Sequence, residues 1–452
     1  MQKLLTKYGL AAHLALLAVA PLFLSATTIL WLSGLALVWV LIEPSRIGGE
    51  MLHDARQRVA YAVFTDPLFW VSLLIAVVAG VRCWNDGVAL SYDAEAARWL
   101  LSEPVFPMLP SSVRGAGLME FAVACALVAV LQGCRHAMGR SARCAFALVA
   151  SFLSGIGAIC LGILYAMGNP WCAGRVECAL TTPMFIGSAF GVYLAAGIVA
   201  MLSAFENKWF RAFPLTLVAV CGNALGLVMF SPPVTAVLFA AIAVLVFAYA
   251  FVYAFRKLGA GGEFKVLVVF SISLVAAGLL LNVLIPREVF QSKIAVYSGG
   301  DIIPEGAEAL RNALSAMCVK IWKGSPWLGS GLGAFPLSLK FVATDADWVA
   351  ISPFQAAPLN GYWLLLVERG VVGAFVIACP LALLLWTYGL RLVKGILKEL
   401  PHPLCWVGPF MLVAATVETL VDASFLFPGA TLSVAAFMAV SASAFPKEKH
   451  NG

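Results

Sequence analysis

Basic residues and glycines gather in one polar stretch of an otherwise apolar chain, residues 286–361. Its central segment, RNALSAMCVKIWKGSPWLGSGLGAFP, begins at Arg311. A guanidinium can bind two phosphate oxygens at once in a fixed geometry, which a lysine ammonium cannot. Arg311 is therefore a candidate for binding a phosphate or diphosphate. The alternative is a surface ion pair with Glu308, which lies one turn away in a helix.

Basic and acidic residues are equally numerous in the stretch 286–361, so its net charge alone does not attract an anion. An anion site there would depend on the placement of individual side chains. The sequence offers several candidates for a second basic group beside Arg311: Arg287, Arg98, Arg114, Lys320 and Lys323.

The glycine-spaced segment PWLGSGLGAF follows shortly after Lys320 and Lys323. Gly329, Gly331 and Gly333 permit tight turns and a close approach of backbone. Consecutive N–H groups in such a segment can bind an anion. The alternative is an ordinary turn, and the pattern by itself does not decide between the two.

A second polar feature opens a long apolar run, NGYWLLLVERGVVGAFVIACPLALLLW. Here Glu368 and Arg369 are expected about two turns into a membrane helix, near its outer end. Ionisable residues at membrane depth are functional candidates by default. For Glu368 the alternative is an ion pair with an arginine.

Composition identifies the elements that must position these residues. The chain of 452 residues is 62% hydrophobic and 12% charged, with a mean hydropathy of +0.95. Soluble domains carry about 25% charged residues. Long apolar runs recur along the whole sequence, which predicts an all-α, polytopic membrane protein. The alternating pattern of a membrane barrel and the basic tracts of a nucleic-acid-binding protein are absent.

The apolar runs predict about twelve transmembrane helices and one large loop. Residues 1–285 hold the first nine spans, residues 286–361 form the loop with the candidate site, and residues 362–452 hold three spans and a tail. The first two spans are short and turn near residues 25–28, which favours two helices over a cleaved signal peptide. The predicted spans are 10–25, 28–43, 64–82, 116–134, 145–167, 185–204, 212–230, 233–255, 265–285, 362–389, 403–422 and 425–445.

The distribution of lysine and arginine sets the orientation of the chain. Short loops on one side are basic, such as CRHAMGRSAR and RLVKGILKEL, whereas the short turns on the other side, SATT, SPP and DAS, carry no basic residue. By the positive-inside rule both termini are cytoplasmic and the loop 286–361 faces outward. A second outward segment spans residues 83–115.

The stretch 304–324 is predicted to form a helix that begins near Pro304 and ends at Gly324. Its apolar residues recur at helical spacing and form one stripe. We expect this helix to lie at the membrane interface with its apolar face down and Arg311 at the level of the headgroups. The residues of the stripe are Leu310, Leu314, Met317 and Ile321.

Most of the 11 cysteines lie in apolar runs and are expected to be buried. Cys172 and Cys178 lie in a predicted outward turn, where they either form a disulfide or remain free thiols. They do not define a zinc site, because the neighbouring sequence supplies no further ligands.

Two linked motifs resemble the superfamily of O-antigen ligases and O-antigen polymerases. The first is an arginine followed by a proline and a glycine-rich run that ends in phenylalanine. The second has the form Asn-x-Tyr, then Leu-Val-Glu-x-Gly-x-x-Gly, at the start of a late span. In this chain they are Arg311, Pro326 and Gly329 to Phe335, and then Asn360, Tyr362 and Leu366 to Gly373.

The resemblance implies a GT-C-like glycosyltransferase of the bacterial inner membrane that needs no metal or other cofactor. Its donor is a glycan on undecaprenyl pyrophosphate, used at the periplasmic face. Membrane lipids surround the enzyme. The acceptor is a lipid A-core sugar for a ligase, a lipid-linked glycan for a polymerase, or a protein hydroxyl for a protein O-oligosaccharyltransferase. Arg311 corresponds to the arginine that binds the donor diphosphate. Asn360 and Tyr362 correspond to the second motif.

One departure from the ligase pattern concerns the catalytic base. Ligases have a histidine where this chain has Leu359, and none of its five histidines is predicted to face outward. We therefore expect a polymerase or a divergent ligase. Glu368 is the leading candidate for the base that activates the acceptor hydroxyl. Glu418 and Asp422, four residues apart on one helix face, are candidates for binding sugar hydroxyls or pairing with Arg114, and Glu120 is placed similarly.

Two other functions are compatible with a polytopic helical protein. A transporter or flippase would show broken helices and polar groups at mid-membrane, whereas the polar residues here concentrate in one outward loop. A peptidoglycan polymerase of the shape-and-division type has a similar plan, but no motif places its loop aspartate in this chain.

Overall fold

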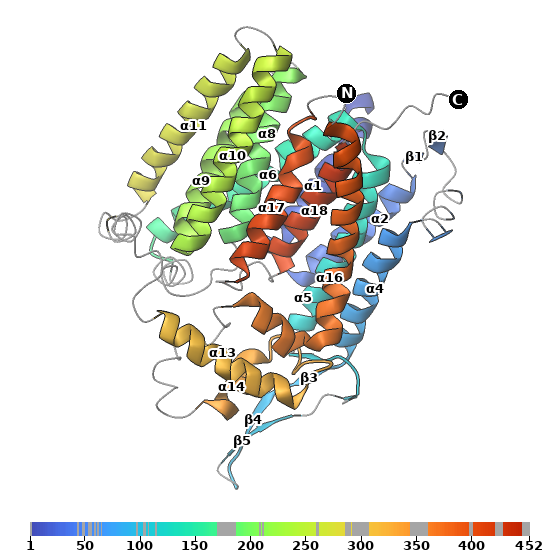
Figure 1. Cartoon of the computed structure of the whole chain (residues 1–452), viewed down its shortest axis with the longest axis vertical. Coiled ribbons are helices and arrows are strands. Elements are labelled where there is room, and N and C mark those ends of the chain that lie inside the picture. The colour runs from blue at the N-terminus through green and yellow to red at the C-terminus, as the bar shows by residue number, and fades with distance from the viewer. Residues whose placement is uncertain are drawn as a thin grey trace.

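The computed structural model shows a bundle of long apolar helices with a small folded region at one end (Figure 1). The structure describes residues 2–42, 45–47, 50–52, 57, 60, 63–64, 66–95, 98–102, 105–106, 108–113, 115–169, 187–207, 209, 212–258, 262–284, 291, 307–343, 360–396, 401–420 and 428–444.

Apolar helices among the described residues lie where the sequence predicts spans. Eight of them are long and apolar enough to cross a membrane, and four are shorter apolar helices. The protein is therefore an all-α polytopic membrane protein in its main architecture. The helices are α1 (Gln2–Val19), α2 (Ala26–Ile42), α4 (Pro67–Trp84), α5 (Ala116–Gln132), α6 (Arg140–Ala166), α8 (Gly187–Glu206), α9 (Phe213–Phe230), α10 (Pro233–Leu258), α11 (Gly262–Leu284), α16 (Gly361–Ile396), α17 (Leu404–Glu418) and α18 (Pro428–Ala444).

The first two helices turn where the sequence predicts. The 3-10 helix η1 (Ala20–Leu22) ends α1, and α2 begins at Ala26. Ser25 lies between them, and its hydroxyl is hydrogen-bonded to the hydroxyl of Thr28 at 2.9 Å. A serine in this position satisfies polar groups at a helix start.

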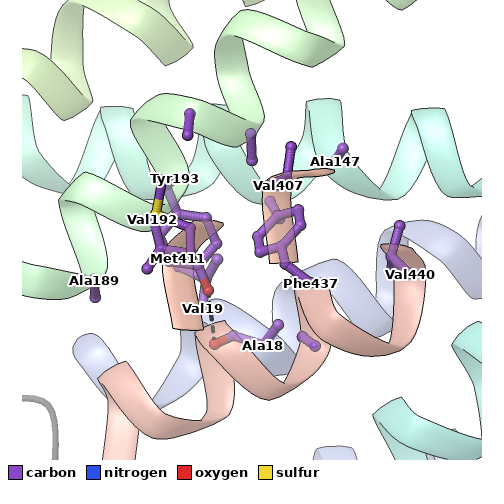
Figure 2. Close-up of a cluster of buried hydrophobic side chains, with 14 of the residues drawn as sticks. Ala18, Val19, Ala147, Ala189, Val192, Tyr193, Val407, Met411, Phe437 and Val440 are labelled. Atoms are coloured by element: carbon purple, nitrogen blue, oxygen red, sulfur yellow. Dashed lines mark hydrogen bonds between the residues drawn. The ribbon is translucent and has the colours of Figure 1, made fainter. Parts of the chain in front are cut away.

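Helix α8 lies at the centre of the bundle, and its residues from Gly187 to Ala204 are buried. The phenol of Tyr193 donates a hydrogen bond to the carbonyl of Ala18 at 3.0 Å and accepts one from Ser433 at 2.9 Å. Figure 2 shows the Tyr193 ring beside Met411 and Phe437, which belong to α17 and α18. A buried hydroxyl with both bonds made fixes the relative positions of α1, α8 and α18.

The small region consists of two helices and two pairs of short strands. They are α13 (Ala307–Gly324), α14 (Phe335–Val342), β3 (Asp86–Val88), β4 (Leu90–Asp93), β5 (Arg98–Leu101) and β6 (Ser112–Val113). Strands β4 and β5 form an antiparallel hairpin, and β3 pairs with β6 in parallel. In Figure 1 these elements lie at the lower end of the bundle, which we call the capped end. The opposite end is where α1 begins.

Strand structure is the main difference from the sequence-based expectation. The all-α expectation included no strand, whereas the outward segment 83–115 contains β3 to β6. Two further strands, β1 (Ser45–Ile47) and β2 (Glu50–Leu52), form a pair of their own. These strands are only two to four residues long, so they carry little periodicity that a sequence pattern could reveal.

Candidate functional site

Helix α16 is interrupted near its start. Gly370 has φ 64° and ψ −174°, so two helical segments meet there at a kink. Figure 1 shows the segment after the kink running along the bundle. The residues Pro326 to Ala334, which we call the glycine loop, occupy the break.

Four backbone hydrogen bonds join the glycine loop to the two sides of the break. The N–H groups of Ser330 and Gly331 donate to the carbonyls of Val367 and Glu368, at 2.8 and 3.2 Å. The N–H groups of Val371 and Val372 donate to Pro326 and Trp327, at 3.0 and 3.1 Å. In an unbroken helix the N–H groups of Val371 and Val372 would donate to the carbonyls of Val367 and Glu368. The loop thus satisfies the four groups that the kink leaves unpaired.

The glycines at this junction are required by conformation and by space. Gly329, Gly331 and Gly333 have φ of 77°, 107° and 73°, which L-residues rarely adopt. A side chain at Gly329 would place its Cβ 2.6 Å from the backbone N of Arg369. A side chain at Gly370 would overlap the carbonyl of Trp327. The predicted close approach of backbone at the glycine run is confirmed.

The glycine loop binds a carboxylate of the chain itself. The N–H of Phe335 donates to Oε1 of Glu368 at 3.4 Å, and the N–H of Gly333 is a second donor to this carboxylate. Glu368 is only 8% exposed. In this conformation Glu368 therefore holds the loop against α16. The sequence also allowed an arginine partner for Glu368; the hydrogen bonds found are to loop N–H groups.

Three charged side chains meet beside the kink, from α4, α5 and α16. Oε1 of Glu120 lies 2.7 Å from Nη1 of Arg369 and 3.5 Å from Nη1 of Arg82. All three side chains are largely buried. Gly373 makes room for the cluster, since a Cβ there would lie 2.7 Å from Nη2 of Arg82. Two guanidiniums thus share one carboxylate oxygen, and the buried carboxylate of Glu368 lies close enough to interact with both of them.

Two buried atoms of this cluster have no hydrogen-bond partner among the described residues. They are Nε of Arg82 and Oε2 of Glu120. A buried polar atom without a partner costs about 1–3 kcal/mol, so such atoms are concentrated where water or a polar ligand binds. The residues of this cluster lie at the last turn of α4 and the second turn of α5, so the kink of α16 is level with the helix ends at the capped end.

Helix α13 ends at Gly324, as predicted, and its apolar stripe is buried. Leu314, Met317 and Ile321 face a core shared with α14 and the first part of α16. The stripe therefore packs on protein, whereas the sequence-based expectation placed it on the membrane interface; α14 and α16 supply an apolar partner that the sequence did not reveal. Cys318 lies in the same core, where burial raises the pKa of its thiol to about 12.

The structure describes the side chains of only some of the basic candidates. Lys320 and Lys323 are exposed. Arg311 lies near the start of α13, and its side chain is outside the described part of the structure, as are those of Glu308 and Leu310. Arg98 lies in β5, again without a described side chain. Other predicted residues lie outside the described residues altogether: Arg287, Arg114, Asp422, Leu359, Cys172 and Cys178.

Asn360 and Tyr362 tie the start of α16 to the end of α17. Oδ1 of Asn360 accepts hydrogen bonds from the N–H groups of Tyr362 and Trp363, at 3.0 and 3.3 Å. Asn360 is therefore the N-cap of α16. The Tyr362 hydroxyl donates to the carbonyl of Thr416 at 3.2 Å. These contacts give both residues a structural role beside the binding role that the motif implies.

Glu418 is buried at the capped end, between three helices. Its Oε1 accepts hydrogen bonds from Ser188 of α8 at 2.6 Å and from Thr235 of α10 at 3.1 Å. It has no exposed surface. Glu120, which the sequence placed as a possible partner of Arg114, pairs with Arg82 and Arg369.

Sequence reasoning missed Arg82 and the kink at Gly370. A single arginine within the apolar run VVAGVRCW is the signal that could have identified Arg82, because an arginine at the end of a span needs a partner. Within the described part of the chain, no three His, Cys, Asp or Glu side chains are grouped as they would be around a metal ion.

The fold and the site define a membrane-embedded helical protein with a charged, loop-filled break in one helix. No family model matches the chain, and no curated protein matches it. The relation to the O-antigen ligase and polymerase superfamily therefore rests on the two motifs, and the function it implies is a proposal.

Proposed function

We propose that the chain is a glycosyltransferase that moves a glycan from undecaprenyl pyrophosphate to an acceptor at the capped end. The acceptor is another lipid-linked glycan or a lipid A-core sugar, so the product is a polymerised or ligated surface polysaccharide. One observation supports this most: the two motif segments, Pro326 to Phe335 and Asn360 to Gly373, are joined by backbone hydrogen bonds. Segments that serve one reaction are expected to meet in space.

The charges beside this junction suit the proposed chemistry. The acceptor oxygen attacks the anomeric carbon, the bond from that carbon to the diphosphate oxygen breaks, and the diphosphate leaves with the bonding electrons. The departing charge needs positioned cations, each worth about 3–4 kcal/mol where a single well-placed donor has been removed. In the proposal Arg311 binds the diphosphate and Arg369 adds positive charge at the kink.

The proton of the acceptor hydroxyl must pass to a base as the new bond forms. Glu368 is the proposed base from the motif. Because its carboxylate is held by the glycine loop, it acts in this conformation as a positioning residue. It becomes a base only when the loop moves away on substrate binding.

The orientation of the chain is part of the same proposal. Arg135, in the π-helical segment Gly133–Ala137 that follows α5, lies at the opposite end of the bundle, as do Arg256 and Lys257 at the end of α10. By the positive-inside rule, a basic opposite end supports cytoplasmic termini and a periplasmic capped end in a bacterial inner membrane. Twelve spans are part of the same proposal.

Deleting the gene and examining the surface glycan tests the proposal. A single repeat unit on the lipid A-core indicates a lost polymerase, and a bare core indicates a lost ligase. Complementation with Arg311→Ala should leave the protein in the membrane and fail to restore the glycan. An unchanged glycan in the deletion strain, or full restoration by Arg311→Ala, would overturn the assignment. If the deletion removes sugar from proteins alone, the acceptor is a protein hydroxyl and the activity is protein O-glycosylation.

A lipid-linked glycan flippase is the second candidate, and one observation favours it. Discontinuous helices with charged residues are typical of transporters, and α16 is discontinuous at Gly370. In transporters such breaks lie near the bilayer midplane, whereas here the break is level with the end of α4. A flippase would move a fluorescent undecaprenyl-pyrophosphate glycan across vesicles without forming a new glycosidic bond, which separates the two candidates.

A further inference from the structure

The face of α4 that points away from the bundle carries a continuous apolar stripe. Trp70, Leu74, Val77 and Trp84 follow helical spacing and are exposed, and Trp84 is 72% exposed. The other face buries small residues and Arg82. An exposed apolar face on a membrane-spanning helix faces lipid, and a tryptophan at its end marks the membrane–water interface.

The stripe does not stop where the helix ends. Val105, Phe106, Met108 and Leu109, which we call the apolar loop, are all exposed, and Met108 is 86% exposed. The ring of Phe106 lies 5.5 Å from that of Trp84, measured between centroids. The apolar loop thus extends the lipid-facing surface of α4 beyond its last residue.

One buried side chain holds the polar backbone of the apolar loop away from its surface. The Nδ2 group of Asn85 donates to the carbonyls of Phe106, Leu109 and Pro110, at 3.0, 3.2 and 3.1 Å. Its Oδ1 accepts from the N–H of Phe106 at 2.8 Å. Asn85 is 1% exposed.

This arrangement reduces the cost of placing the loop in lipid. Irregular backbone is excluded from the hydrocarbon because its unpaired N–H and C=O groups cost several kcal/mol each. The N–H of Leu109 is bonded to the carbonyl of Phe106 at 3.0 Å. Pro107 and Pro110 carry no N–H at all. The segment 104–110 also lacks any charged side chain.

We propose that the apolar loop inserts its side chains into the membrane leaflet adjoining the capped end, beside the end of α4. The occupant of this surface is lipid, because the loop is continuous with the lipid-facing stripe of α4. This insertion fixes the height of the glycine loop relative to the bilayer. The residues that follow the apolar loop pair with Leu332 of the glycine loop, through Leu332 N–H to Ser111 and Val113 N–H to Leu332, at 3.2 and 2.8 Å.

Photolabelling of the full chain in vesicles tests the insertion without reference to glycan transfer. The vesicles contain phosphatidylethanolamine, phosphatidylglycerol and a phospholipid with a diazirine on its acyl chain. After illumination, fragment-ion sequencing should find label on the apolar loop and on the exposed stripe of α4. The hairpin turn at Ala94 and Glu95 should carry none. Label on α4 without label on the apolar loop would overturn the proposal.

Two substitutions and a crosslink sharpen the test. Met108→Asp should abolish most of the label on the apolar loop, whereas Ala94→Asp, at a turn that is also exposed, should leave it unchanged. Equal labelling of the loop with and without Met108→Asp would count against insertion. Benzoylphenylalanine in place of Met108 should form adducts with lipid; adducts with a second copy of the chain would assign this surface to self-association.

Discussion

The two ends of the bundle use buried charges differently. At the opposite end, Asp66 pairs with Arg135 at 2.7 Å, and Glu206 binds His402 and Tyr253, each at 2.9 Å. Asp66 also caps the start of α4 through the N–H of Leu68. These carboxylates join helix ends to one another: Asp66 joins the start of α4 to the π-helical segment Gly133–Ala137 after α5, and Glu206 joins the end of α8 to α10 and to His402. This is a structural use of charge.

At the capped end, the charges surround a helix that is not regular. Glu120 is shared by Arg82 and Arg369, and Gly370 breaks α16 directly after Arg369. Four largely buried charged side chains (Arg82, Glu120, Glu368 and Arg369), unpaired buried atoms and a helix kink coincide there. Such features cost stability, and proteins retain them mainly where a ligand or a reaction uses them. The comparison therefore identifies the capped end as the functional one.

Removing the shared carboxylate should have the largest effect. Glu120→Gln removes the carboxylate that two mostly buried guanidiniums share, and breaking a buried pair costs about 3–5 kcal/mol. The matched change at the opposite end, Glu206→Gln, should cost about 1 kcal/mol, because an amide can still hydrogen-bond His402 and Tyr253. Thermal unfolding in detergent measures both. Equal losses of stability in the two variants would contradict the proposed difference between the two ends.

The kink provides the next largest effect. Gly370→Ala forces a left-handed φ on an L-residue, at about 1–3 kcal/mol, and its Cβ would overlap the carbonyl of Trp327. Gly389→Ala on the same helix meets no atom within 4 Å and should stabilise by about 0.5–1 kcal/mol. Amide hydrogen exchange should show faster exchange of the N–H groups of Ser330 and Gly331 in Gly370→Ala and not in Gly389→Ala. Unchanged protection in that variant would show that the loop does not depend on the kink.

Acid stability tests the paired charge at the opposite end. Burial raises the pKa of Asp66, but His136 and the charge of Arg135 more than offset this, so the pKa lies well below its ordinary value of 3.8. A lowered carboxyl pKa stabilises the fold above the unfolded-state pKa and loses this effect as the pH falls through the folded-state pKa.

The Asp66→Asn variant, which keeps a capping side chain, should therefore be less stable than the unmodified chain by about 1.5–3 kcal/mol near neutral pH. The difference should shrink as the pH falls below about 4. Glu95→Gln, in the exposed hairpin turn, serves as the control. A difference that persists unchanged in strong acid would contradict the charge-based account of this end.

The N-cap of α16 gives the smallest effect and separates two roles of the second motif. Asn360→Ala should cost about 1 kcal/mol, whereas Asn360→Ser keeps a capping oxygen and should cost little. Stability and glycan transfer are measured together. If Asn360 only caps the helix, Asn360→Ser retains transfer. Loss of transfer at full stability would show that Asn360 binds substrate, as the motif implies.

Hydropathy predicted the helical bundle well, because lipid requires long apolar segments with internally paired backbone. The end of α13 at Gly324 and the close backbone approach at the glycine run were also predicted from local rules. These features depend on residues near each other in sequence.

Features that depend on packing were not predictable. Arg82 and Glu120 are 38 residues apart, and only the packing of α4 on α5 brings them together. The short strands β3 to β6 lack a periodic pattern. Nothing in the sequence around Gly370 indicates that the glycine loop, some forty residues earlier, fills the break in α16.

The most direct test of the central claim is glycan transfer by the purified chain in vesicles that contain an undecaprenyl-pyrophosphate-linked glycan. The unmodified chain and Gly389→Ala should release undecaprenyl pyrophosphate and form a longer or transferred glycan. Correctly folded Gly370→Ala should form none. No product with the unmodified chain, or full activity of Gly370→Ala, would contradict the account.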